Sequence, residues 1–163
     1  MSQVTEKEFE NAIVLYGGII TKICYYFSLD TDEFNDLRQE VLYNIWKGWD
    51  KFRNDSKLSS WIYRISFNTC ISYRRKTKRS REILSIDKVI DIPYEEDVSY
   101  IERYNEMHSL IQQLKYDDRA IILMWLDEKS YEEISELMGI NRNTLAVRLK
   151  RIKEKLIKLS HGN

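Results

Sequence analysis

The chain has 163 residues, of which 43% are hydrophobic and 32% charged, while five are glycine and one is proline. So few helix breakers predict a globular, strongly helical protein, and the length allows either one domain or two small ones. The formal net charge is zero, from 26 basic and 26 acidic side chains, which excludes a generally basic coat for nucleic acid.

The start of the chain and its cysteines bear on location. The first ten residues are charged and acidic, which predicts no secretory signal, and the apolar run near residues 13–20 is too short to span a bilayer. Cys24 and Cys70 lack metal-ligand spacing, so we expect buried thiols in a reducing cytosol. No metal cluster, nucleophile–base set or phosphate-binding glycine loop stands out. The sequence therefore predicts a cytoplasmic protein with no metal, no cofactor and no enzymatic activity.

Two helices are predicted first in the chain, because apolar residues recur at helical spacing over residues 9–27 and again over residues 34–52. The remaining faces of the second helix carry mostly polar side chains. These are Asp36, Gln39, Glu40, Tyr43 and Lys47. Taken alone, such a face is most simply solvated.

A polar loop over residues 54–59 precedes a third helix, which Ser60 can cap and which runs over residues 61–78. Its aromatic residues are interleaved with cations. That composition suits single-stranded or distorted DNA, because bases stack on rings while cations follow the backbone. Trp61 is more simply a core residue. Residues 74–81, however, hold six cations and no anion, and these repel one another unless a polyanion lies nearby.

An acidic segment then divides the chain. Residues 82–97 contain six carboxylates, one lysine and the single proline, without clear periodicity. We therefore predict a flexible acidic linker over residues 81–101, which separates domains at residues 1–80 and 102–163. The predicted fold class is all-α, with two small helical domains.

The C-terminal domain ends in a predicted helix-turn-helix. Ser130 and Glu133 have the spacing of a capping box, and Gly139 can adopt the positive φ that ends a helix. Asn141 then caps a second helix, which carries seven Lys or Arg and one Glu over residues 142–158. Such a helix fits a DNA major groove, with its N-terminal tip at base edges and its cations on phosphates. A plain helical hairpin is the alternative, but the succession of caps favours the helix-turn-helix.

Three segments in this order resemble the sigma-70 superfamily of bacterial transcription initiation factors, specifically its short extracytoplasmic-function (ECF) class. DLRQEVLYNIW at residues 36–46 is similar to the family's core-polymerase-binding helix. SSWIYRISFNTCISYRRKTKR at residues 59–79 resembles the helix that contacts the minus-10 promoter element. SYEEISELMGINRNTLAVRLKRIKEKL at residues 130–156 resembles the unit that reads the minus-35 element. The resemblance implies a protein that binds core RNA polymerase and directs it to particular promoters.

The resemblance also assigns residues to three surfaces. Polymerase binding is assigned to Asp36, Gln39, Glu40 and Asn44. Contact with the minus-10 DNA, including capture of an extruded base by the loop, is assigned to Asn54, Asp55, Ser56, Lys57, Arg64, Asn68, Arg74 and Arg75. Contact with the minus-35 DNA is assigned to Arg142, Asn143, Thr144, Val147, Arg148 and Arg151.

The implied partners are core RNA polymerase, promoter DNA and an anti-sigma factor, often membrane-attached, with no small-molecule substrate. Two other classes compete with this interpretation. A stand-alone helix-turn-helix regulator would leave the polar face of residues 36–46 and the basic residues 74–81 without a purpose. A small nuclease or recombinase would need clustered carboxylates or a catalytic Ser or Tyr, which the sequence does not single out.

Overall fold

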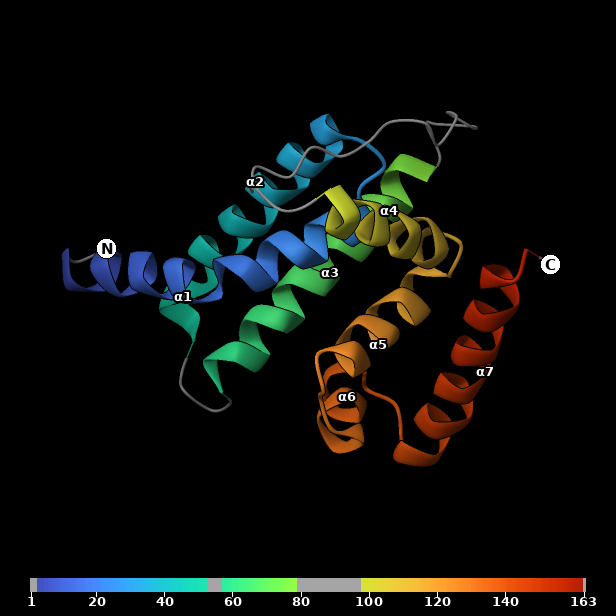
Figure 1. The fold of residues 1–163 in the computed structure, drawn as a ribbon. Coiled ribbons are helices and arrows are strands. Elements are labelled where there is room, and N and C mark those ends of the chain that lie inside the picture. Colours follow the sequence, from blue (N-terminus) through green and yellow to red (C-terminus); the bar gives the residue numbers. More distant parts are fainter. Residues whose placement is uncertain (1–2, 53–56, 79–97, 163) are drawn as a thin grey trace. The chain divides into compact units, whose positions relative to one another are not determined.

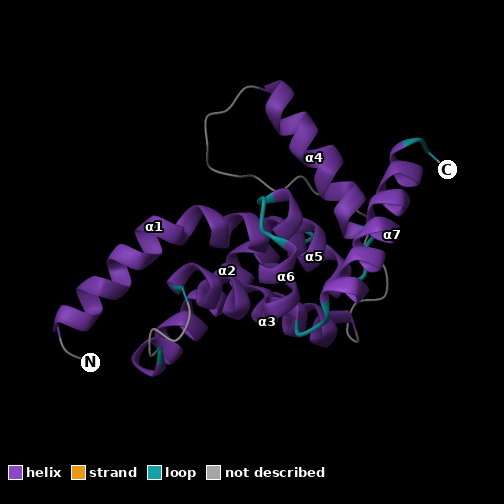
Figure 2. Cartoon of the chain, turned by 90° about the horizontal axis from the view of Figure 1, so that it is seen from below, coloured by secondary structure: helices purple, strands orange, loops and turns teal. Residues whose placement is uncertain are grey.

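The computed structural model describes residues 3–52, 57–78 and 98–162, with side chains for residues 5–52, 57–77 and 105–162. These residues form seven α-helices and one short 3-10 helix, and no strand occurs among them (Figure 2). The chain divides into two compact units, a first unit at Met1–Asp91 and a second unit at Ile92–Asn163. The predicted all-α fold with two small helical domains is confirmed.

Much of the predicted linker, residues 81–101, lies outside the described residues. Its last four residues, 98–101, belong to the first described helix of the second unit. That helix thus begins before residue 102, where the sequence placed the start of the C-terminal domain.

The first unit is built from three helices: α1 (Gln3–Phe27), α2 (Thr31–Gly48) and α3 (Leu58–Lys78) (Figure 1). A 3-10 turn, Trp49–Lys51, follows α2. Each helix packs against the other two, and all three contribute fully buried side chains to one core. Both cysteines are buried in this core and neither forms a disulfide, which confirms the prediction of buried thiols.

The helix α3 begins at Leu58, three residues earlier than the predicted start. The carbonyl of Lys57 accepts a hydrogen bond from the N–H of Trp61, so Ser60 lies inside the first turn rather than capping it. The first amides of a helix have no helical acceptor in any case, and serine is therefore tolerated in that turn.

Aromatic rings join the end of α2 to the start of α3. The Trp49 and Trp61 ring centroids are 6.0 Å apart, and those of Phe52 and Trp61 are 5.0 Å apart. A Cβ added to Gly48 would lie 3.1 Å from the Trp61 ring, so any larger residue there would require the ring to shift. The interpretation of Trp61 as a core residue fits this environment better than a DNA-stacking platform.

A buried ion pair connects α2 to α3. Glu33 is 2% exposed, and its Oε2 accepts hydrogen bonds from Arg74 Nη1 at 2.7 Å and from the backbone N–H of Leu29 at 2.9 Å. Asp30 caps the same helix by accepting a hydrogen bond from the N–H of Glu33. Burying two charges is costly, and this close pairing offsets much of that cost.

The second unit contains α4 (Val98–Gln112), α5 (Tyr116–Leu126), α6 (Tyr131–Met138) and α7 (Arg142–Ser160) (Figure 1). The last helix, α7, packs against each of the other three, and α5 packs against α6. The buried side chains Leu145, Leu149 and Ile152 of α7 share a core with the almost fully buried apolar residues of α5. This core holds the C-terminal helix in place.

The predicted helix-turn-helix is present in α6 and α7. The Oγ of Ser130 accepts a hydrogen bond from the N–H of Glu133 at 3.1 Å. Gly139 ends α6 with φ of 68°, in the left-handed region. The Oδ1 of Asn141 accepts a hydrogen bond from the N–H of Thr144 at 2.8 Å. All three predicted cap residues are confirmed.

The structure also bears on the membrane question. Among the helices described, none combines the length and the apolar composition that a bilayer crossing requires.

The buried pair predicts a large effect on stability. We expect Arg74→Ala to lower the free energy of unfolding by about 3 kcal/mol, because Glu33 is left buried without its counter-charge. Arg75→Ala is the control, since Arg75 is exposed, and we expect a change below about 0.5 kcal/mol. Urea unfolding followed by circular dichroism measures both. Equal effects of the two substitutions would show that the Glu33–Arg74 pair contributes nothing to the free energy of unfolding.

Candidate functional site

The first candidate surface lies along α2. Leu37, Val41 and Ile45 are fully buried, and helical geometry therefore turns the intervening residues outward. The exposed side chains on this outer side include Asp36, Gln39, Glu40 and Tyr43, which are called the α2 surface below, and Lys47 one turn further on. The Tyr43 side chain is 61% exposed, although it is a large ring. Two carboxylates outnumber the one lysine, and together with an amide and a ring they favour a partner that is basic and partly apolar.

Asn44 does not belong to the α2 surface. It is half-buried, and its Nδ2 donates a hydrogen bond of 3.0 Å to the Oγ1 of Thr69 in α3. Of the four residues predicted for polymerase binding, three therefore share the exposed surface and one connects two helices. Tyr43, to which no role was assigned, occupies the surface beside them. The spacing of apolar residues in the helix already places Tyr43 on the exposed side, so the sequence contained the information needed to include it.

The second candidate surface lies on α3 and immediately before it. Arg64, Asn68 and Arg75 are exposed at spacings of four and seven residues, which places them on one side of the helix, and Lys57 is exposed just ahead of it. Asn54, Asp55 and Ser56, predicted to form the base-capturing loop, lie outside the described residues.

Arg74 was predicted to contact the minus-10 DNA, and its position does not fit that role. Its side chain is only 10% exposed, and Glu33 holds the guanidinium inside the first unit. In the sequence Arg74 is one cation in a basic run. Its partner Glu33 lies 41 residues away, so no local pattern indicates the pair.

The third candidate surface is the outward side of α7. Arg142, Asn143, Thr144, Val147 and Arg151 are exposed there. The side chain of Arg148 is 33% exposed. The first three of these residues form the N-terminal tip of α7, next to the turn after α6. All six residues predicted for minus-35 contact therefore lie on the accessible side of one helix.

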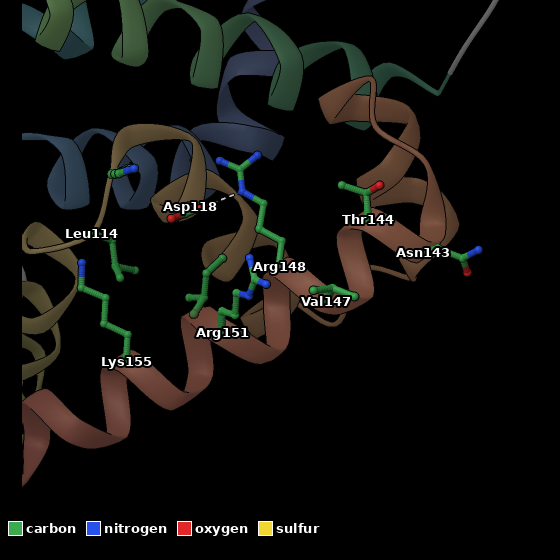
Figure 3. Close-up of a pocket in the computed structure, with 10 residues that line it drawn as sticks. Leu114, Asp118, Asn143, Thr144, Val147, Arg148, Arg151 and Lys155 are labelled. Carbon is green, nitrogen blue, oxygen red and sulfur yellow. Dashed lines mark hydrogen bonds and ion pairs between the residues drawn. The ribbon is translucent and has the colours of Figure 1, made fainter.

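A groove runs along α7 beside the start of α5 (Figure 3). Ten residues line it, and they include four cations and one anion. The charged residues are Lys115, Arg148, Arg151, Lys155 and the anion Asp118. This excess of positive charge suits a polyanion such as the phosphate backbone of DNA.

Two arginines of α7 are held by carboxylates from other helices. The Nε of Arg148 donates a hydrogen bond of 2.6 Å to the Oδ1 of Asp118 in α5 (Figure 3). The Nη1 of Arg142 lies 2.7 Å from the Oε1 of Glu132 in α6. No role was assigned to Asp118 from the sequence. Its partner lies 30 residues further on, and no local pattern indicates such a pair.

Among the described residues, no three His, Cys, Asp or Glu side chains gather in a way that could hold a metal ion. The fold and these surfaces define a two-unit helical protein with a cationic helix-turn-helix.

Comparison with known proteins identifies the family within this class. The family model for Sigma-70 region 2 matches residues 13–80, and that for Sigma-70, region 4 matches residues 104–156. The chain is 29% identical to the ECF RNA polymerase sigma factor SigW of Bacillus subtilis, over 92% of this chain and 87% of SigW. It is 31% identical to the RNA polymerase sigma factor YlaC of the same organism, over 76% of this chain and 75% of YlaC.

A solved structure shares the fold. It is that of the sigma factor RpoE in complex with the anti-sigma factor NepR from Bartonella quintana. The TM-score is 0.74 at 24% identity, over 95% of this chain and 98% of that one. The chain belongs to the sigma-70 family of RNA polymerase sigma factors, in its extracytoplasmic-function class. Sigma factors are non-enzymatic transcription initiation factors that direct RNA polymerase to promoters.

Proposed function

We propose that the two units divide the work of a sigma factor between them. The first unit binds core RNA polymerase and the minus-10 DNA, and the second unit binds the minus-35 DNA. The observation that carries this proposal is the contrast between the acidic α2 surface and the cationic outer side of α7, each on its own compact unit. A stand-alone regulator would use only the second of these surfaces.

The α2 surface is the proposed polymerase contact. Asp36 and Glu40 supply negative charge for a basic partner, and Gln39 between them offers both a donor and an acceptor. Tyr43 adds an exposed ring, the type of side chain that frequently dominates binding energy when an interface covers it. Asn44 contributes indirectly, because its bond to Thr69 fixes α2 against α3.

The exposed side of α3 is the proposed minus-10 contact. Lys57, Arg64 and Arg75 are positioned to follow the phosphate backbone, and Asn68 can donate to or accept from a base or phosphate. Residues 54–56 capture an extruded base in this proposal, a task that uses the low cost of unstacking in melted DNA. Arg74 supports the helix from inside through Glu33 and does not contact DNA.

The tip of α7 is the proposed minus-35 contact. Arg142, Asn143, Thr144 and Val147 face base edges in the major groove, while Arg151 neutralises a phosphate. Arg148 lies between these two sets along the helix.

The remaining parts of the proposal concern location and partners. The chain acts in the cytoplasm, where core polymerase and promoters are found, and it performs no catalysis. An anti-sigma factor, often membrane-attached in this class, holds it inactive. The complex of the sigma factor RpoE with the anti-sigma factor NepR supports this partner, because RpoE shares this fold. CnrH also shares the fold, and it was solved in complex with the cytosolic domain of CnrY.

Run-off transcription tests the proposed function directly. Purified full-length chain and core RNA polymerase are incubated with a fragment library of the source genome, and the transcripts are sequenced. We expect defined start sites that need both proteins. The absence of such transcripts, together with failure of the chain to co-purify with core enzyme, would contradict the proposal.

Substitutions on the α2 surface should affect polymerase binding differently from a substitution of Asn44, which faces α3. We expect Gln39→Ala combined with Glu40→Ala to weaken core-polymerase binding at least about tenfold, and Tyr43→Ala to weaken it by a similar factor. Asn44→Ala should leave the affinity within about twofold, because Asn44 faces α3. Biolayer interferometry with immobilised core enzyme measures all four proteins. A larger loss from Asn44→Ala than from Tyr43→Ala would contradict the assignment.

The phosphate contact predicted for Arg151 has a salt signature. We expect Arg151→Ala to weaken promoter binding by the chain in complex with core polymerase and to reduce the slope of log K against log salt by about one. Lys7→Ala removes an equal charge at an exposed position of α1 and should leave the slope unchanged. Fluorescence anisotropy between 50 and 200 mM salt, roughly the range over which such contacts weaken, provides the measurement. An unchanged slope for Arg151→Ala would remove Arg151 from the DNA contact.

A further inference from the structure

The groove beside α7 contains a carboxylate that phosphate binding alone does not explain. Asp118 is the one acidic residue among the ten that line the groove, and it stands among four cations. A negative charge there repels phosphate and lowers the affinity for any DNA, whatever its sequence. Asp118 therefore works against general DNA binding in the very surface proposed to bind DNA.

The position of Asp118 is well defined. It lies in the first turn of α5, where the helix dipole favours a negative charge, and α5 packs against α7. Its Oδ1 accepts the 2.6 Å hydrogen bond from Arg148 Nε, and the two side chains are 22% and 33% exposed (Figure 3). Solvent screens such a partly buried pair less than it screens a pair on an open surface.

The atom that Asp118 contacts is informative. A guanidinium has five N–H donors in one plane, and Nε supplies one of them. The hydrogen bond to Nε leaves the four donors of Nη1 and Nη2 available, while it fixes the plane and direction of the group. An arginine held in this way loses less conformational entropy when it binds a second partner. The paired acceptors O6 and N7 of guanine match such a guanidinium best.

We propose that Asp118 is a specificity-determining positioning residue. It orients Arg148 for a base contact in the minus-35 major groove, and its charge simultaneously weakens binding to unrelated DNA. Both effects raise the ratio of specific to non-specific binding. This inference rests on the proposed function, because it presupposes that α7 reads promoter DNA.

A simpler role for Asp118 would be to stabilise the start of α5. Asp117 separates the two explanations, because it lies in the same helical turn and carries the same charge, but it does not line the groove. Asp117→Asn therefore removes an equal charge from the same helix start and serves as the matched control.

The test selects DNA from a pool. Full-length chain in complex with core polymerase is mixed with duplexes whose upstream promoter element is randomised, and the bound DNA is sequenced. The proteins are wild type, Asp118→Asn, Asp118→Glu, Asp117→Asn, Arg148→Ala and the double variant Asp118→Asn with Arg148→Ala. Affinity for an unselected duplex of the same length is measured in parallel, and thermal unfolding confirms that each variant is folded.

We expect Asp118→Asn to reduce base preference about fivefold or more at the same positions that Arg148→Ala affects. Binding to the unselected duplex should strengthen, because one negative charge is lost. Asp118→Glu keeps the charge and moves the carboxylate, so base preference should fall while non-specific binding stays at the wild-type level. The double variant should match Arg148→Ala in base preference, since Asp118 acts through Arg148. Asp117→Asn should retain wild-type preference.

Three results would overturn the inference. Asp118→Asn could strengthen binding to all sequences equally, which would make Asp118 a simple counter-charge. It could alter different base positions from Arg148→Ala, or Asp117→Asn could reproduce its effect. If the wild-type complex selected no sequence at all, the proposed function would fail and this inference with it, and that result differs from the other three.

Discussion

Burial of one apolar stripe on each helix determines where the functional side chains lie. In α2 the stripe includes Leu37, Val41 and Ile45, and in α7 it includes Leu145 and Leu149. Each such side chain contributes about 1.5–3 kcal/mol when it is fully buried, whereas an exposed ion pair contributes about 0–1 kcal/mol. The stripes therefore set the rotation of each helix, and the charged residues take the directions that remain. The acidic α2 surface and the cationic side of α7 are consequences of the two cores.

Three ion pairs of similar length have different roles because their exposure differs. Glu33–Arg74 is almost fully buried at 2.7 Å, so breaking it strands a charge in the core and its main effect is on folding. Arg142–Glu132 also measures 2.7 Å, but with side chains 66% and 63% exposed it adds little stability. Arg148–Asp118 lies between these extremes at 2.6 Å. It is sheltered enough to orient a side chain and open enough for that side chain to reach a ligand.

The division into two units has a functional counterpart. Each unit has its own buried core, so each can present its surface without help from the other. In the proposed function, contacts on both units engage one promoter, and joining them in one chain raises the effective concentration of the second contact once the first has formed. Modest affinities at each surface then suffice, which leaves binding open to reversal by an anti-sigma factor.

The sequence by itself determined the features that depend on neighbouring residues. The helical stripes, the caps at Ser130 and Asn141 and the left-handed Gly139 are local patterns, and they were enough to predict the helices and a helix-turn-helix. The acidic segment predicted the division into two domains, and the resemblance of three segments to known sigma factors predicted the family. Only the tertiary structure decided which polar residues meet across helices. Arg74 and Asn44 turned inward, and Asp118 entered the groove, through partners 41, 25 and 30 residues away. Helical periodicity gives the side of a helix on which a residue lies, but it contains no information on which residue of another helix will face it.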